Sequence, residues 1–275
     1  MSAAPFTVGC VQTTAGLDVL PSVEAACDGV RDARKRGADL ILLPESVNII
    51  DLNKTRLLKK LDFEQDNPAL SAFRNVAVET GAWILVGSII LKIAEDRLAN
   101  RSFLINGQGE IISRYDKLHM FDATLGDGEN YRESALYEAG DKAVIADTPW
   151  GGLGMAICYD LRFPHLFRAL AQGGAKFLAL AAAFTRPTGE AHWHCLLRAR
   201  AIENGCYVHA CGQCGEHEGG RKTYGHSLII DPWGEILADA GTEVGVVTAR
   251  VDPAAVEAAR AKIPSLAHDR AFAGP

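Results

Sequence analysis

Three strand-like segments of this chain each end in a side chain that can take part in chemistry. In chain order, these side chains are Glu45, Lys117 and Cys158. In a buried strand, a reactive polar side chain can reach solvent or a cleft only at the end of the strand, where the chain turns. An acid, an amine and a thiol in such places indicate a sheet protein that carries a Cys-dependent amide hydrolase site.

Cys158 follows the apolar run Gly152 to Ile157, and Tyr159 to Pro164 then read as a tight turn that opens a helix. A thiol there lies at the carboxyl end of a strand beside exposed backbone N–H groups. An attacking group and an oxyanion site can be built together at such a place. The alternative is a buried structural thiol, because six other cysteines show that the chain accepts Cys as a small filler.

The charged candidates have two interpretations each. Glu45 can act as a general base toward the thiol, or it can be a loop carboxylate just past a strand. Lys117 can neutralise the pocket and stabilise a tetrahedral intermediate, or it can belong to a solvated charge cluster. Glu133 lies in a polar loop, where an exposed carboxylate is the simple interpretation. If Glu45 is ionised beside the thiol, we expect Cys158 to rest protonated.

Composition excludes several classes of protein. The chain has 275 residues, of which 48% are hydrophobic and 23% charged, so it can bury a substantial core. A net charge of −6 and sparse aromatic residues argue against a nucleic-acid partner. No apolar run is long enough for a membrane span, and no secretory signal is recognisable, so we expect no membrane partner. Seven cysteines without disulfide-like spacing favour a reduced, cytoplasmic protein.

Strand and helix patterns alternate, which predicts an α/β fold with helices covering a sheet. The predicted helices are 20–35, 67–80, 164–172, 190–204 and a last one from Pro253 to about 262. The predicted strands are 6–12, 38–43, 83–91, 100–106, 110–115, 143–147, 153–158, 176–182, 206–211, 225–230, 235–238 and 244–251. Asn67, Pro68 and Gly81 are typical of the two ends of a helix. No linker divides the chain, so we expect one domain over residues 1–275 with a tail from about residue 264.

Cys211 and Cys214 form a C-x₂-C pair with Cys206, His209 and His217 nearby. A zinc or redox site is conceivable there. The sequence contains no second such pair, and the first lies where a strand runs into a Gly-rich loop. We therefore expect no metal ion and no cofactor.

Three segments resemble the signature motifs of the nitrilase superfamily of carbon–nitrogen hydrolases. They are Leu-Leu-Pro-Glu45, Tyr-Asp-Lys117-Leu-His-Met-Phe-Asp122 and Gly-Met-Ala-Ile-Cys158-Tyr-Asp-Leu-Arg-Phe-Pro164. The resemblance continues through residues 191–204 and 224–234, so it covers nearly the whole chain. Within the superfamily, the sequence is most similar to the branch that contains deaminated glutathione amidase and omega-amidase.

The resemblance implies an α/β fold arranged as a four-layer α-β-β-α sandwich, assembled as a homodimer or a larger homo-oligomer. It also implies a catalytic triad of Glu45, Lys117 and Cys158, with Glu133 as a supporting carboxylate. In the mechanism that follows from it, the side chain of Lys117 and the backbone N–H of Tyr159 hold the oxyanion.

Tyr159 is also a candidate for substrate binding, and so are three further residues. Arg162 can clamp a substrate carboxylate or brace the turn after Cys158. Phe184 and Thr188 follow a buried strand and are expected to line the pocket, as the resemblance also implies.

The expected partner is a small-molecule amide that bears a carboxylate. The implied activity is hydrolysis of a linear amide through a thioester, with deaminated glutathione as the substrate. The alternatives are omega-amidase activity on 2-oxoglutaramate, hydrolysis of an N-carbamoyl amine, and a catalytically silent scaffold with the same fold.

Overall fold

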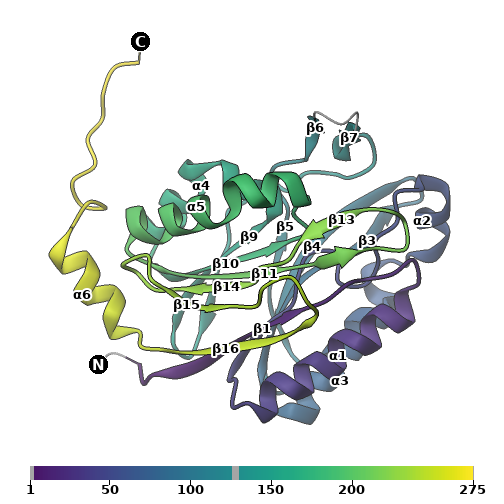
Figure 1. The fold of residues 1–275 in the computed structure, drawn as a ribbon, viewed down its shortest axis with the longest axis horizontal. Helices are drawn as coiled ribbons and strands as arrows, with labels where there is room; N and C mark the ends of the chain where they lie inside the picture. Colours follow the sequence, from purple (N-terminus) through teal and green to yellow (C-terminus); the bar gives the residue numbers. More distant parts are fainter. Residues whose placement is uncertain (1–2, 126–129, 275) are drawn as a thin grey trace.

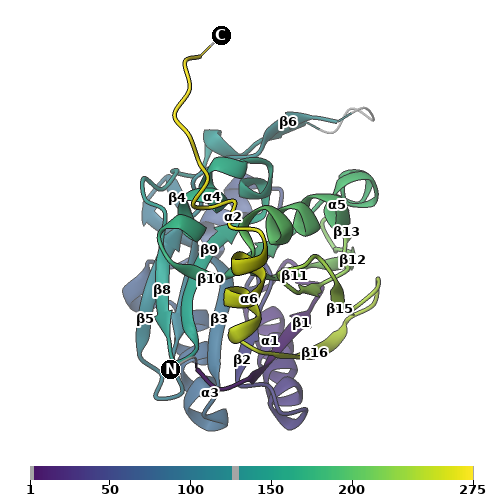
Figure 2. The same ribbon diagram turned by 90° about the vertical axis from the view of Figure 1, so that its left-hand side faces the viewer.

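Two six-stranded sheets lie face to face, and helices cover their outer faces (Figure 1). This architecture comes from a computed structural model that describes residues 3–125 and 130–274. The arrangement is the expected four-layer α-β-β-α sandwich, and the view in Figure 2 shows the two sheets between their helices. Within the described residues, no helix has the length and apolar character needed to cross a lipid bilayer.

The first sheet carries the N-terminal half of the chain and closes with a C-terminal strand. Its order is β16-β1-β2-β3-β4-β5. The strands are β1 (Phe6–Gln12), β2 (Leu40–Leu42), β3 (Trp83–Ala94), β4 (Arg97–Ile105), β5 (Ile111–Asp116) and β16 (Gly245–Val251). Helices α1 (Val19–Lys35) and α3 (Pro68–Thr80) cover it. Because β1 pairs with both β2 and β16, the two ends of the chain are tied into one sheet.

The second sheet has the order β15-β14-β11-β10-β9-β8. Its strands are β8 (Ile145–Thr148), β9 (Gly151–Ile157), β10 (Ala175–Ala182), β11 (Tyr207–Gly212), β14 (Leu228–Ile230) and β15 (Ile236–Asp239). Helices α4 (Pro164–Gln172) and α5 (Arg186–Asn204) cover this sheet. Helix α6 (Ala254–Lys262) follows β16 of the first sheet.

Short elements surround one end of the sandwich. They are helix α2 (Lys54–Lys60), the strand pair β6 (Asp122–Thr124) and β7 (Asn130–Arg132), and the strand pair β12 (Cys214–Glu216) and β13 (Lys222–Tyr224). Single turns of 3₁₀ helix occur at Glu64–Asp66, Glu133–Ala135 and Cys158–Arg162. The sequence patterns did not predict these pieces. Most of them span only three residues, which is too few for a periodicity to be recognised.

Most predicted boundaries lie within a few residues of the observed ones. The Asn67 side chain accepts a hydrogen bond from Leu70 N at 3.0 Å, as a helix N-cap does, and Gly81 ends α3 in the left-handed region. Some boundaries differ by three or four residues. Strand β3 ends at Ala94 rather than at residue 91, β4 begins at Arg97 rather than at residue 100, and β14 begins at Leu228 rather than at residue 225. Helix α5 begins at Arg186 rather than at residue 190, because a proline is tolerated in the first turn. Strand β9 stops at Ile157, so Cys158 lies outside it.

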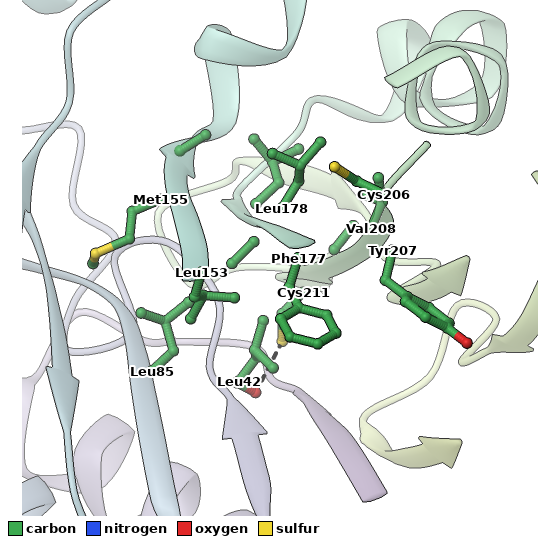
Figure 3. Packing of buried hydrophobic residues seen from close by; sticks show 14 of the residues in the cluster. Leu42, Leu85, Leu153, Met155, Phe177, Leu178, Cys206, Tyr207, Val208 and Cys211 are labelled. Carbon is green, nitrogen blue, oxygen red and sulfur yellow. Dashed lines mark hydrogen bonds between the residues drawn. The ribbon is translucent and has the colours of Figure 1, made fainter. Parts of the chain in front are cut away.

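The two sheets share an apolar core (Figure 3). Leu42 and Leu85 of the first sheet pack in one cluster with Leu153 and Phe177 of the second. The Cys211 thiol crosses the interface and donates a hydrogen bond to the carbonyl of Leu42 at 3.2 Å. This packing fixes the position of the strand ends on which the reactive side chains lie.

Gly87 marks the closest approach of strand β3 to its neighbours. A Cβ atom there would lie 1.9 Å from the Leu43 carbonyl oxygen and 2.6 Å from the Ala181 side chain. Only glycine fits, because any side chain would push β3 away from the segment that leads to Glu45.

His209 of β11 is fully buried between rings of the core. Its ring lies 5.7 Å from that of Phe177 and 6.1 Å from that of Tyr207, and neither ring nitrogen has a hydrogen-bond partner among the described residues. Burial lowers the pKa of His209 to about 3.

We predict that His209 makes the protein less stable as the pH falls. The unfolded chain binds a proton at this histidine near pH 6.5, whereas the folded chain does not until about pH 3. Within that window, the free energy of unfolding should fall by up to about 1.4 kcal/mol per pH unit from this group. Urea unfolding at several pH values, with wild type and His209→Phe, measures the slope.

The Phe variant should lose this part of the slope, while replacement of the exposed His268 by Asn should keep it. Equal slopes for wild type and His209→Phe would contradict the assignment.

Candidate active site

The three strand-end residues lie together in the structure. Glu45 follows β2 and Lys117 follows β5, both in the first sheet, whereas Cys158 follows β9 of the second. The Nζ atom of Lys117 lies 3.1 Å from Oε1 of Glu45, and also 2.9 and 2.8 Å from the two carboxylate oxygens of Glu133. All four residues line one cavity of about 510 Å³, here called the wide cavity.

The backbone turns sharply at Cys158. Its φ of 49° lies in the left-handed region, which a residue with a side chain seldom adopts. The strained residue directly follows β9 and is the first residue of the 3₁₀ helix, and it is 8% exposed. Such strain persists only where the surroundings hold it, and it is concentrated at functional sites.

Asp160 holds this turn. Its carboxylate is fully buried and accepts hydrogen bonds from Ile157 N at 2.8 Å and from the Tyr115 hydroxyl at 2.6 Å. The backbone N–H and the Nδ1 atom of His119 lie 3.1 and 2.6 Å from its other oxygen. Tyr115 and His119 flank Lys117 in the chain, so Asp160 ties the nucleophile's turn to the segment that carries the ammonium. The sequence analysis gave Asp160 no role, because Tyr115 and His119 lie 45 and 41 residues away from it in the chain.

The Glu45 carboxylate has a full set of donors although it is only 4% exposed. Oε1 accepts from Asn100 Nδ2 at 2.8 Å and from Lys117, while Oε2 accepts from the backbone N–H of Ala183 at 2.7 Å. The side chain of Gln213 also binds the Glu45 carbonyl at 3.0 Å. Donors from both sheets therefore fix one orientation of the carboxylate.

Charges set the protonation states at the centre. Burial opposes ionisation of Glu45, but the charges of Lys117 and Arg221 outweigh it and hold its pKa below the usual range. Burial and the neighbouring Glu45 raise the pKa of the Cys158 thiol well above its usual value. Burial disfavours the Lys117 ammonium, but Glu133 and Glu45 raise its pKa above the usual value. The resting site thus holds a carboxylate, an ammonium and a neutral thiol, so the thiol has a base beside it.

Glu133 links the ammonium to the neighbouring loop. One of its oxygens accepts a hydrogen bond from the backbone N–H of Phe121 at 2.6 Å as well as from Lys117. Its side chain is 14% exposed. Glu133 is therefore not a simple exposed carboxylate of a polar loop, because its side chain points inward and forms an ion pair with Lys117.

A second, narrower space opens beside Cys158 and is here called the narrow cleft. The four residues predicted to bind substrate, Tyr159, Arg162, Phe184 and Thr188, all line it. The guanidinium of Arg162 lies 5.5 Å above the ring of Phe184.

The turn after Cys158 is braced by a different arginine. The buried Arg200 donates to the carbonyl of Leu161 at 2.7 and 3.2 Å. Among the described residues, Arg162 lies within 4 Å of no carboxylate.

Arg221 is a site residue that the sequence analysis missed. It lies between β12 and β13, lines both the wide cavity and the narrow cleft, and donates from Nη2 to the carbonyl of Ala183 at 2.6 Å. The local sequence, with two glycines before it and Lys222 after it, gives no signal that separates this arginine from a surface charge.

Metal-ligating residues lie elsewhere. In the part of the chain that the structure describes, one group could hold an ion, with ligand atoms of His194, His226 and Asp239 within 4.8 Å of one another. Asp239 already accepts from both histidines, and none of the three lines the wide cavity. Near the C-x₂-C pair, the Cys211 thiol binds backbone carbonyls, and both ring nitrogens of His217 have hydrogen-bond partners.

Comparison with known proteins gives consistent matches. Residues 7–261 match the family model described as carbon-nitrogen hydrolase. A deaminated glutathione amidase of Yersinia enterocolitica is 40% identical over 85% of this chain and 82% of that protein. One from Synechocystis sp. (strain PCC 6803 / GT-S) is 39% identical over 96% of this chain and 98% of that protein.

Solved structures agree with the fold. The NitFhit protein of Caenorhabditis elegans superposes with a TM-score of 0.92 at 34% identity, over 98% of this chain and 66% of that chain. Nit3 of Saccharomyces cerevisiae, a member of branch 10 of the nitrilase superfamily, gives 0.85 at 29% identity over 95% of each chain. The chain belongs to the carbon–nitrogen hydrolase family of the nitrilase superfamily and is a hydrolase of non-peptide carbon–nitrogen bonds.

We predict that Asp160→Asn both destabilises the protein and slows turnover. The amide places an N–H₂ group where the carboxylate accepts from a backbone N–H and a hydroxyl, so at least one buried donor loses its partner. Such a loss costs about 1–3 kcal/mol. Thermal unfolding and the kcat of the variant, beside Asp147→Asn on the exposed part of β8, measure both effects. Wild-type values for Asp160→Asn would contradict the anchoring role.

Proposed function

We propose that this carbon–nitrogen hydrolase is a Cys-dependent amidase that hydrolyses deaminated glutathione, with Glu45, Lys117, Cys158 and Glu133 as its catalytic residues. The observation that carries the proposal is the buried thiol beside an ionised carboxylate and an ammonium, at the wall of a cavity of about 510 Å³. The names of the bacterial relatives support the choice of substrate.

In the first half-reaction, Glu45 removes the proton of the Cys158 thiol, and the sulfur attacks the amide carbon. The Lys117 ammonium and the backbone N–H of Tyr159 stabilise the negative oxygen of the tetrahedral intermediate. Protonated Glu45 then gives its proton to the amide nitrogen, the C–N bond breaks, and the amine leaves. The acyl group remains on Cys158 as a thioester.

In the second half-reaction, Glu45 takes a proton from water, and the resulting hydroxide attacks the thioester carbon. The C–S bond breaks, the sulfur recovers its proton from Glu45, and the carboxylic acid leaves. Glu133 keeps Lys117 in place through both steps, because it shares the ammonium with Glu45.

The narrow cleft supports recognition of the acyl part. Arg162 has no carboxylate partner in the described residues, and Arg200 already braces the turn. We therefore assign Arg162 to the carboxylate of the 2-oxoglutaryl group. The cleft has a volume of only about 10 Å³, so the carbon chain would lie at its mouth, against Tyr159, Phe184 and Thr188.

The size of the wide cavity favours deaminated glutathione over 2-oxoglutaramate. The first substrate releases cysteinylglycine, whereas the second releases only ammonia and would leave most of the cavity of about 510 Å³ unfilled. No comparable feature favours an N-carbamoyl amine. A silent scaffold is disfavoured, because three buried charges are costly to retain without use.

We also propose that residues 1–275 form a single domain with a tail from about residue 264, and that the protein is cytoplasmic and forms homo-oligomers. The pairing of β1 with β16 supports one domain. Seven free cysteines support a reducing compartment. Exposed apolar side chains at Ile202 and Trp233 support self-association.

We predict that Cys158→Ala loses more than about 10³-fold in turnover of deaminated glutathione, because the thioester cannot form. Wild type should hydrolyse this substrate with a higher kcat/KM than 2-oxoglutaramate. Steady-state release of 2-oxoglutarate measures both.

The matched control is Cys195→Ala, which removes an exposed thiol and should behave as wild type. Retained turnover in Cys158→Ala would contradict the mechanism, and preference for 2-oxoglutaramate would contradict the proposed substrate.

A further inference from the structure

Long-range strand pairing places Arg221 at the junction of the two spaces. Thr223 forms an antiparallel bridge with Thr185, and Tyr224 N donates to the Phe184 carbonyl at 3.0 Å. These contacts hold the chain around Arg221 against the segment that follows β10. The guanidinium then lies 5.7 Å over the ring of Tyr131 and donates to the carbonyl of Ala183.

The Arg221 guanidinium lacks an anion. Among the described residues, no carboxylate oxygen lies within 4 Å of it, and its Nε atom is buried without a hydrogen-bond partner. A buried donor without a partner is costly, and a charged one more so. The two carboxylates of the site, Glu45 and Glu133, do not contact it and are held in place by other donors.

The location of Arg221 indicates which part of a substrate it faces. Arg162 lines only the narrow cleft, whereas Arg221 also lines the wide cavity. After the first half-reaction, the acyl group stays on Cys158 and the amine must leave. We assign the larger space to the amine, and Arg221 borders this space whereas Arg162 does not.

We propose that Arg221 binds a carboxylate on the amine part of the substrate through Nε–H and a further guanidinium N–H. The enzyme would then select amides that carry one carboxylate on each side of the scissile bond, with Arg162 on the acyl side and Arg221 on the amine side. This inference rests on the proposed function, in which the amine is a dipeptide with a free carboxyl end.

Arg221 has a competing role as a counter-charge. Glu45 and Glu133 bring two negative charges to the site, and Lys117 brings one positive charge. A guanidinium nearby could serve only to balance them. Loss of a counter-charge would slow every amide alike, whereas loss of a binding group would slow only substrates with a carboxylate on the amine part.

The test compares kcat/KM of Arg221→Gln and wild type on three amides. They are deaminated glutathione, which is N-(2-oxoglutaryl)-cysteinylglycine, the same compound with its C-terminal carboxylate converted to an amide, and 2-oxoglutaramate. The kcat/KM of Arg221→Gln should fall roughly 10- to 100-fold on the first amide and change little on the other two. The kcat/KM of Arg162→Gln should fall on all three amides, because each of them carries the carboxylate of the acyl part. An equal loss on all three in Arg221→Gln would overturn the inference.

Two further variants separate charge from geometry. Arg221→Lys keeps the positive charge but loses the planar guanidinium with its paired N–H donors. Its kcat/KM on deaminated glutathione should therefore stay low. Full recovery in this variant would assign Arg221 to charge balance. Lys222→Gln removes the neighbouring exposed charge, which pairs with Glu216, and should match wild type.

A binding measurement decides the inference even if wild type hydrolyses none of the three amides, the result that would reject the proposed function. Mass spectrometry follows the alkylation of Cys158 by iodoacetamide, and glycylglycine should slow this reaction more than glycylglycinamide does. Arg221→Gln should abolish the difference. No preference for the free carboxylate in wild type would overturn the inference.

Discussion

The site depends on one ammonium that two carboxylates share. Lys117, Glu45 and Glu133 bring three charges into a pocket where their side chains are 2%, 5% and 14% exposed. Each charge alone would be strongly unfavourable there, so the cluster exists only while all three stay in contact. The N–H donors of Asn100, Ala183 and Phe121 are aimed at the same carboxylates and complete their solvation.

This requirement explains why the surrounding backbone is held so closely. Glu45 and Lys117 belong to the first sheet and Cys158 to the second, so the interface between the sheets sets the distance between base and nucleophile. Asp160 fastens the strained turn at Cys158 to the segment that carries Lys117. Gly87 lets β3 approach the chain before Glu45. A small shift at either place would separate charges that the pocket cannot solvate.

The sequence predicts the parts of this site that local patterns encode. Strand ends indicated Glu45, Lys117 and Cys158 as candidates, which the structure brings together, and a cap, a proline and a glycine identified α3. Arg221 escaped prediction because its place depends on the contact of β13 with Thr185, which lies 38 residues earlier in the chain. The start of α5 was missed for a local reason, since a proline reads as a break although it fits a first helical turn.

The central claim is that the carboxylate and ammonium pair make Cys158 the group that carries the acyl chain. Rapid acid quench during turnover of deaminated glutathione, followed by mass spectrometry of the peptides, tests it most directly. The account predicts a 2-oxoglutaryl thioester on the peptide that contains Cys158. Turnover with no acylated cysteine, or with the acyl group on one of the other six, would contradict it.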